Sequence, residues 1–188
     1  MSKRTLWALL MVLVLAVFSA ACGTAADDNG GDDAGDDNVE VTQGGDVTIA
    51  VITHGDGGSF WSVAKKGAED AGKDLGVTVR YNESNNDAQA QAQMIEAAVT
   101  QKVDGLAVSA PDPQAISGAV KKAVDAGIPV ITLNSGLGDY QRLGAITHVG
   151  QTEELAGEAA GKRLADQGKK KLLCIIHEQG NVGLEERC

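Results

Sequence analysis

The sequence predicts an α/β fold in which a doubly wound parallel sheet carries helices on both faces. Short apolar runs alternate with amphipathic helical patterns from residue 47 onward, and such alternation is typical of parallel strands joined by crossover helices. The clearest unit spans residues 103–136, where the apolar runs GLAVS and PVITL flank a helical stripe. Continuous apolar runs of this length indicate strands that are buried on both faces.

The helix of this unit has a predicted start, inward face and end. Asp112 can cap it, Pro113 suits its first turn, and Gly127 suits the left-handed residue that follows its last turn. Apolar side chains at helical spacing form one stripe, which consists of Ile116, Ala119, Val120, Ala123 and Val124.

The other segments repeat this pattern. Strands are expected at residues 47–53, 77–81 and 145–149, and a last one within residues 171–177. Helices are expected at residues 59–75, 87–101 and 152–166. Their expected inward residues are Phe60, Ala64, Gly67, Ala68, Ala71 and Leu75 in the first, Met94, Ile95, Ala98 and Val99 in the second, and Leu155, Ala156, Ala159, Ala160 and Leu164 in the third.

Residues 1–21 have the pattern of an export signal. Lys3 and Arg4 precede an apolar run at residues 6–18 that is short for a bilayer span, and small residues follow it. Cys22 comes next and resembles the lipidated cysteine of a bacterial lipobox, although Ser19 stands where that motif prefers Leu. The alternative is an ordinary secreted protein with a spare cysteine.

Residues 22–45 are acidic and of low complexity, which predicts a disordered tether behind the lipid anchor. Seven acidic side chains lie between residues 27 and 40, so the formal net charge of −10 leaves −5 for the residues from Asp46 onward. We expect the tether to be a solvated spacer, or to hold the domain off an anionic membrane surface. No basic face indicates a nucleic-acid partner.

Polar residues follow two neighbouring predicted strands. Parallel strands end at one edge of a sheet, where ligands of open α/β sheets bind, so Ser109 and Asn134 are expected beside a small polar ligand. The loop after the first strand adds Phe60 and Trp61, an adjacent aromatic pair whose rings can stack on the C–H faces of a sugar. We expect one ring to touch the ligand and the other to pack inward.

No motif indicates catalysis, a cofactor or a metal. The GDGG run is not a dinucleotide fingerprint, because Phe60 stands at the position of the third glycine. The sequence contains no G-x-S-x-G elbow and no Walker loop. His54, His148 and His177 lack the spacing of zinc ligands.

Residues 46–188 resemble the N-terminal half of the periplasmic sugar-binding proteins of ABC transporters, of the ribose-binding type. The motifs that carry the resemblance are IAVITHGDGGSFW, AGIPVITLNSG, HVGQTEELAGEAAGKRLA and EQGNVGLEER. The resemblance implies two similar α/β lobes with ligand captured between them. It places the first lobe at residues 46–150 and an incomplete start of the second lobe at residues 151–188.

The resemblance also implies roles for individual residues. These residues add to the loop residues His54, Asp56 and Ser59, which either offer polar groups to sugar hydroxyls or form a solvated loop, and to Ser109 at its strand end. The expected ligand contacts on the family pattern are Phe60 or Trp61, Asn134 and Arg187, with Gln151 and Glu178 as weaker candidates. Asp112 is expected to cap a helix rather than to contact ligand. Ser135 stands where several relatives carry Arg, which argues against ribose itself. Cys174 and Cys188 either form a disulfide, which an exported compartment permits, or remain free thiols.

The expected function is therefore a binding module. The protein would capture a small sugar or polyol in the periplasm, or at the outer face of the cytoplasmic membrane, and deliver it as a monomer to an ABC permease. The alternative is a receptor for a furanosyl quorum signal, or one that presents its ligand to a chemoreceptor or sensor kinase. A transcription regulator and an exported enzyme are disfavoured, because the chain starts with an export signal and shows no catalytic set.

Overall fold

The computed structural model describes residues 45–188, which all belong to one compact unit. The export signal, the lipidation at Cys22 and nearly all of the acidic tether were predicted for residues that lie outside this part of the chain.

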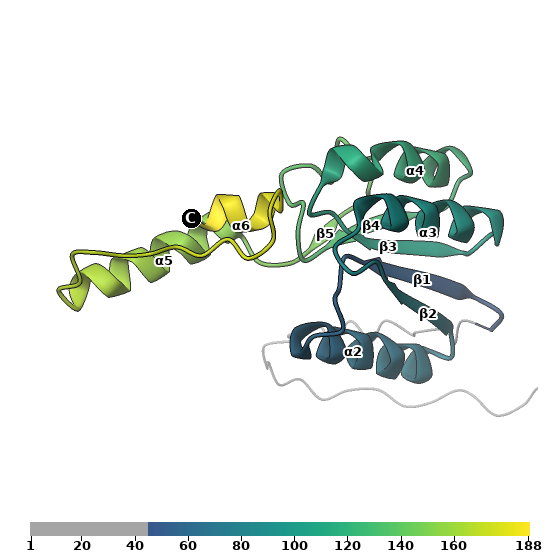
Figure 1. Ribbon diagram of the computed structural model, residues 1–188. Helices are drawn as coiled ribbons and strands as arrows, with labels where there is room; N and C mark the ends of the chain where they lie inside the picture. Colours follow the sequence, from purple (N-terminus) through teal and green to yellow (C-terminus); the bar gives the residue numbers. More distant parts are fainter. Residues whose placement is uncertain (1–44) are drawn as a thin grey trace, which may run out of the picture. The chain divides into compact units, whose positions relative to one another are not determined.

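Five parallel strands form one sheet in the order β2-β1-β3-β4-β5 (Figure 1). The strands are β1 (Thr48–Thr53), β2 (Thr78–Glu83), β3 (Gly105–Ser109), β4 (Val130–Leu133) and β5 (His148–Val149). Each pair of neighbours is in register without a bulge, as in Thr48 with Thr78 and Leu106 with Val130. The predicted parallel α/β class is confirmed.

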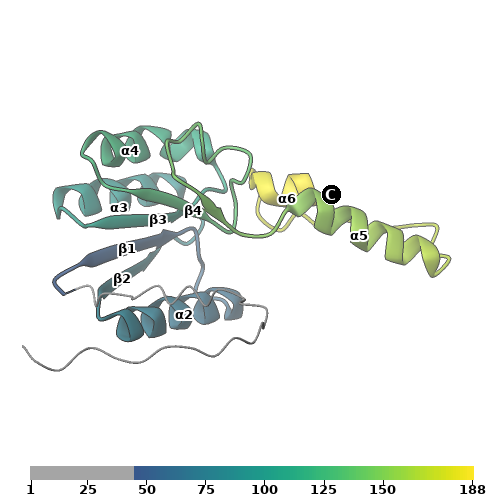
Figure 2. The same ribbon diagram turned by 180° about the vertical axis from the view of Figure 1, so that it is seen from behind.

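Helices cover both faces of this sheet. In Figures 1 and 2, α3 (Ala88–Thr100) and α4 (Pro113–Asp125) lie on one face and α2 (Ser59–Leu75) lies on the other. The helices α5 (Glu153–Asp166) and α6 (Val182–Arg187) pack against each other. Among residues 45–188, no helix is both long and apolar enough to cross a membrane.

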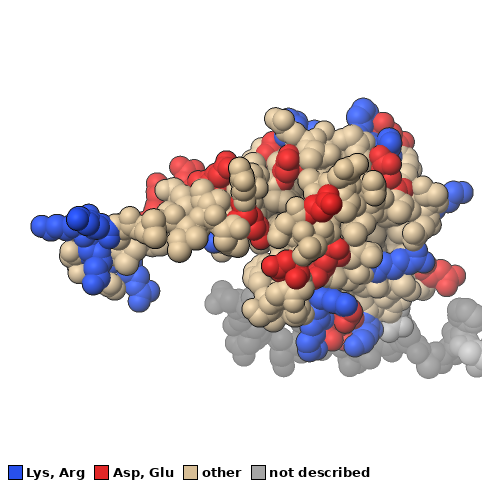
Figure 3. All heavy atoms as spheres, in the orientation of Figure 1, with Lys and Arg blue, Asp and Glu red and all other residues tan. Residues whose placement is uncertain are grey.

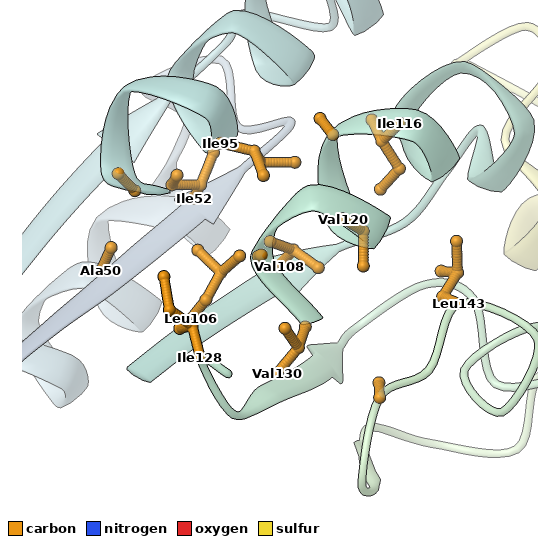
Figure 4. Packing of buried hydrophobic residues seen from close by; sticks show 14 of the residues in the cluster. Ala50, Ile52, Ile95, Leu106, Val108, Ile116, Val120, Ile128, Val130 and Leu143 are labelled. Atoms are coloured by element: carbon orange, nitrogen blue, oxygen red, sulfur yellow. The ribbon is translucent and has the colours of Figure 1, made fainter. Parts of the chain in front are cut away.

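The main core lies between the sheet and the α3–α4 layer. Figure 4 shows Ile52 of β1 and Val108 of β3 turned toward Ile95 of α3 and Val120 of α4, and each of these side chains is at most 1% exposed. The predicted inward stripes of α3 and α4 are confirmed in this core, except that Val124 lies at the exposed edge.

The predicted ends of α4 are also confirmed. Asp112 Oδ1 accepts hydrogen bonds from the backbone N–H groups of Gln114 and Ala115 at 3.1 and 3.0 Å. Gly127, with φ of 78°, follows the last turn in the left-handed region. The local sequence therefore sets both boundaries of the helix that follows β3.

The predicted inward face of α2 is partly wrong. Ala64 and Ala68 are half-buried, as expected of inward residues. Trp61 and Gly72 are buried, whereas four residues that were expected to point inward are exposed: Phe60, Gly67, Ala71 and Leu75. Gly72 lies so close to β2 that an added Cβ would be 2.7 Å from Val79 Cγ2. Small residues bring this helix close to the sheet, so its buried face does not follow its most apolar stripe.

Two predictions near the C-terminal end of the chain are wrong. Leu155 and Leu164 were expected to face a sheet, but α5 packs on α6 and both side chains are exposed. Residues 171–177 were expected to contain a strand, but residues 172–176 form none and their apolar side chains are exposed. A strand requires a partner strand to bond its N–H and C=O groups, and none of the five strands in the described residues pairs with this run.

Candidate functional site

The candidate site lies where β1, β4 and β5 end. A cavity of about 720 Å³ opens at this edge and is also lined by residues of the segment 177–187. Six of the seven predicted ligand contacts line it: His54, Asp56, Phe60, Trp61, Asn134 and Arg187. The fold thus brings together residues that are up to 133 positions apart in the sequence.

The two aromatic side chains at the start of α2 differ in exposure. Phe60 is 61% exposed and Trp61 is 5% exposed, and their rings meet edge to face with centroids 5.0 Å apart. Trp61 also packs edge to face against the imidazole of His54, with centroids 4.8 Å apart. Trp61 therefore supports the wall of the cavity, while Phe60 offers a free ring face for stacking on a ligand.

His54 forms a buried part of the cavity wall. Its Nδ1 lies 2.7 Å from Ser109 Oγ and its Nε2 lies 3.3 Å from Glu178 Oε2. Burial lowers the pKa of His54 below its ordinary value, although the nearby carboxylates of Glu178 and Asp56 act in the opposite direction. Both ring nitrogens thus have protein partners in this structure.

Ser109 is the one predicted ligand contact that does not line the cavity. It is fully buried, and its Oγ accepts a hydrogen bond from the backbone N–H of His54 at 2.8 Å. Gln91 Nε2 donates to the Ser109 carbonyl oxygen at 2.7 Å. Ser109 was expected at the ligand because it ends a strand at the right edge, but its side chain lies behind His54, so it supports the wall of the cavity.

The side chains of Asn134 and Asp56 each make a polar contact within their own loop. Asn134 follows β4 with φ of 61°, and its Oδ1 lies 3.1 Å from Ser135 Oγ. Asp56 Oδ1 accepts from the backbone N–H of Gly58 at 2.9 Å, which closes the turn before α2. Each side chain still lines the cavity, so turn formation and a role toward ligand are compatible.

Arg187 is oriented by an acidic partner at the start of α5. Its Nε donates to Glu153 Oε2 at 2.5 Å, and Gln151 Nε2 bonds both oxygens of the same carboxylate at 3.0 Å. The hydrogen bond from Arg187 is the main cause that lowers the pKa of Glu153, and it raises the pKa of Arg187. Glu153 is 4% exposed, so it holds the guanidinium group at the rim of the cavity.

A disulfide joins Cys174 to Cys188, with their Cα atoms 5.8 Å apart. It closes a loop around the residues that approach the first lobe, including Glu178 and Asn181. Asn181 caps α6 by accepting from the backbone N–H of Gly183 at 3.0 Å.

Glu153 and Asn181 line the cavity and were not predicted as site residues. The sequence could have identified Glu153. It is an acidic residue at the expected start of a helix, and a carboxylate is a suitable hydrogen-bond partner for an arginine that is expected at the ligand. Asn181 had a signal only as a helix cap, and its position beside Ser135 depends on the tertiary fold.

The charges around the cavity suit a neutral ligand that is rich in hydroxyl groups. Asp56, Glu153 and Glu178 face one arginine, Arg187, which is already paired. Carboxylates and amides accept and donate the hydrogen bonds that hydroxyl groups need. On the face shown in Figure 3, acidic and basic side chains are interspersed over the part that contains the sheet, while a separate group of Lys and Arg side chains gathers at the far tip of α5.

Comparison with protein families gives one match that covers most of the chain. The family model described as "Periplasmic binding protein domain" matches residues 49–187. Among curated proteins, the fructose import binding protein of Bifidobacterium longum is 30% identical over 63% of this chain and 37% of its own length. The ribose import binding protein of Bacillus subtilis is 33% identical over 57% of this chain and 34% of its own length.

Solved structures share the fold. A carbohydrate transporter from Acidothermus cellulolyticus in complex with myo-inositol is 44% identical, with a TM-score of 0.73 over 76% of this chain and 50% of that one. An ABC transporter solute-binding protein from Burkholderia graminis in complex with D-arabinose is 30% identical, with a TM-score of 0.66. The chain spans about a third of the curated relatives and about half of these structures.

Proposed function

The chain belongs to the periplasmic binding protein family, and from this premise we propose that it captures a small, uncharged sugar or polyol for import. The observation that carries the proposal is the cavity at the ends of β1 and β4. The first lobe supplies Phe60, Asp56 and Asn134, and Arg187 approaches from the segment beyond residue 150. A ligand that contacts both sides would favour the closed arrangement, because a ligand shifts a conformational equilibrium by its differential affinity.

Two further observations support a hydroxyl-rich ligand. Phe60 presents an exposed ring next to carboxylates and amides, a combination that fits both the C–H face and the hydroxyl groups of a carbohydrate or cyclitol. The related proteins carry names or ligands of this class, namely fructose, ribose, myo-inositol and D-arabinose. Arg187 is neutralised by Glu153, which disfavours phosphorylated sugars and sugar acids.

A ligand screen on the protein expressed from its natural reading frame tests this proposal. The panel contains myo-inositol, xylitol, ribose, arabinose, fructose and glucose, together with a furanosyl signal and amino acids as other classes. A ligand at 1,000 times its Kd stabilises a protein by about 4 kcal/mol, which gives a clear thermal shift. A selective shift with one sugar or polyol supports the proposal, and a selective shift with an amino acid contradicts it.

A matched pair of variants tests the site itself. Phe60→Ala removes the exposed ring, and Val63→Ala removes an exposed apolar side chain of the same helix that does not line the cavity. We expect Phe60→Ala to weaken binding by about tenfold, the equivalent of roughly 1.4 kcal/mol of ring contact, and Val63→Ala to leave it unchanged. Equal affinities for the two variants would place the ligand elsewhere.

The proposed setting of this activity is the outer face of the cytoplasmic membrane. Cys22 would carry the lipid anchor, and the acidic segment after it would connect the anchor to the binding lobes of a monomer that serves an ABC permease. Metabolic labelling with an alkyne fatty acid tests the anchor. Label on the natural protein that disappears in Cys22→Ser supports it, and a protein that is released without label refutes it.

A further inference from the structure

A buried chain of hydrogen bonds runs behind the candidate site and joins the two segments of the molecule. Gln91 of α3 holds the Ser109 carbonyl at 2.7 Å, and Ser109 Oγ lies 2.7 Å from His54 Nδ1. On the other side of the ring, His54 Nε2 lies 3.3 Å from Glu178 Oε2, which also accepts from Asn181 Nδ2 at 2.5 Å. The chain therefore extends from α3 through the ends of β3 and β1 into the segment before α6.

The partners of the two ring nitrogens favour one tautomer of His54. Ser109 Oγ already accepts the backbone N–H of His54 at 2.8 Å, so its own proton is free to be donated to Nδ1. An acceptor role for Nδ1 leaves the proton of the neutral ring on Nε2. That proton points at the Glu178 carboxylate, whereas an unprotonated Nε2 would bring two lone pairs together.

The surroundings of His54 favour the neutral ring. The residue is 3% exposed, and the edge of Trp61 from α2 covers it. The charged or titratable groups that face it are Asp56 in its own loop and His177 and Glu178 in the opposite segment, while Ser109 on β3 and Gln91 on α3 are neutral. Burial thus opposes a positive charge here, and a hydrogen bond from neutral imidazole to carboxylate remains.

We infer that His54 is a positioning residue whose Nε2–H, oriented by Ser109 and Gln91, anchors Glu178 and so holds the segment 177–187 against the first lobe. The anchor extends beyond Glu178, because Asn181 Oδ1 accepts from Ser135 Oγ at 3.1 Å and the backbone N–H of Val182 donates to the Pro111 carbonyl at 3.0 Å. A second cavity of about 350 Å³ shares four lining residues with the candidate site, namely His54, His177, Glu178 and Asn181. The inference does not depend on which ligand the site takes, and the anchor belongs to the arrangement that a ligand contacting both sides of the cavity would favour.

Nuclear magnetic resonance of the imidazole nitrogens tests the first step directly. Long-range proton–nitrogen correlations on the ¹⁵N-labelled protein, expressed from its natural reading frame, distinguish the two tautomers. We expect His54 to carry its proton on Nε2 near neutral pH, and Ser109→Ala to remove this preference. His177, with a side chain that is 65% exposed, provides a reference in the same spectrum. A proton on Nδ1 of His54 in the natural protein would overturn the inference.

A pair of substitutions at His54 tests the second step. In His54→Gln the side-chain amide can replace Nε2–H as the donor to Glu178, whereas in His54→Asn it can reach only the place of Nδ1. Loss of a hydrogen bond to a charged group should raise the equilibrium constant for local opening by about tenfold or more. We therefore expect amide hydrogen exchange in α6 to accelerate about tenfold in His54→Asn and to stay near the natural rate in His54→Gln.

Further variants keep this test decisive if the substitutions at His54 impair folding. Glu178→Ala removes the acceptor at a position whose side chain is 16% exposed, and it should accelerate exchange in α6 while the His54 tautomer stays the same. Glu186→Ala is the control within α6, because Glu186 is exposed and forms no part of the hydrogen-bond chain. Unchanged α6 exchange in both His54→Asn and Glu178→Ala would overturn the inference.

Discussion

Gly157 is the position where one added methyl group should move a functional residue. It lies on α5 against the backbone of Arg187, and a Cβ there would overlap the Arg187 carbonyl oxygen and lie 2.9 Å from its carbon and 3.3 Å from its Cα. Ordinary carbon contacts need about 3.5–4.0 Å, so α6 has to move by roughly 1 Å in Gly157→Ala. Gly161, one turn later on the same helix, has no atom within 4 Å of such a Cβ.

The two glycines therefore form a matched pair. Replacement of either one by Ala removes the intrinsic cost of a helical glycine, which favours folding by about 1 kcal/mol. At Gly157 the overlap costs about 1–3 kcal/mol and strains the bond between Arg187 and Glu153. We expect Gly161→Ala to be neutral or stabilising, and Gly157→Ala to destabilise α6.

Amide hydrogen exchange of α6 gives the measurement. In Gly157→Ala, exchange in α6 should accelerate. In Gly161→Ala the exchange rates of α6 should match those of the natural protein. The reasoning is refuted if Gly157→Ala gains stability by the same amount as Gly161→Ala.

Three other outcomes are expected. Asp112→Ala removes two cap hydrogen bonds and should lower the free energy of unfolding by about 1 kcal/mol in urea denaturation; no loss would contradict the cap. Burial lowers the pKa of His54 in the folded state, so the unfolded state binds a proton first as the pH falls. The free energy of unfolding should therefore decrease below about pH 6.5 and level off once folded His54 protonates. His54→Gln should reduce that slope without abolishing it, because burial also lowers the pKa of His148. A slope of opposite sign in the natural protein would refute the assignment. Cys188→Ser opens a loop of sequence separation 14 and should cost up to about 3 kcal/mol, measured by denaturation with and without reductant; equal stability in all conditions would show that the bridge is not formed.

The first lobe was largely predictable because its signals are local. The limits of α2 and β3, the cap at Asp112 and the inward stripe of α4 follow from apolar spacing and from capping chemistry within a few residues. The shared edge of the parallel strands then predicts that Asn134 and Phe60 lie beside one cavity.

The errors arose where a side chain depends on partners far away in the sequence. The apolar periodicity of α2 does not predict that Gly72, rather than Leu75, lies against β2. The close approach of the helix to the sheet at this point depends on Val79, which belongs to β2. An apolar run such as residues 172–176 becomes a strand only beside another strand. Ser109 was placed at the correct edge of the sheet, but whether its hydroxyl faced ligand or His54 depended on a ring 55 residues earlier.

The strand order has a consequence for the kinetics of folding. Neighbours β1 and β2 pair across 30 residues and β3 and β4 across 24, whereas β1 and β3 pair across 56, as Ile49 does with Gly105. Loop-closure entropy rises only slowly with length, so this longest closure costs about 0.6 kcal/mol more than the others. It nevertheless joins two otherwise local halves, and the hydrogen bond from the backbone N–H of His54 to Ser109 Oγ forms only after this pairing. The pairing of β1 with β3 is therefore the folding step that assembles the wall behind His54.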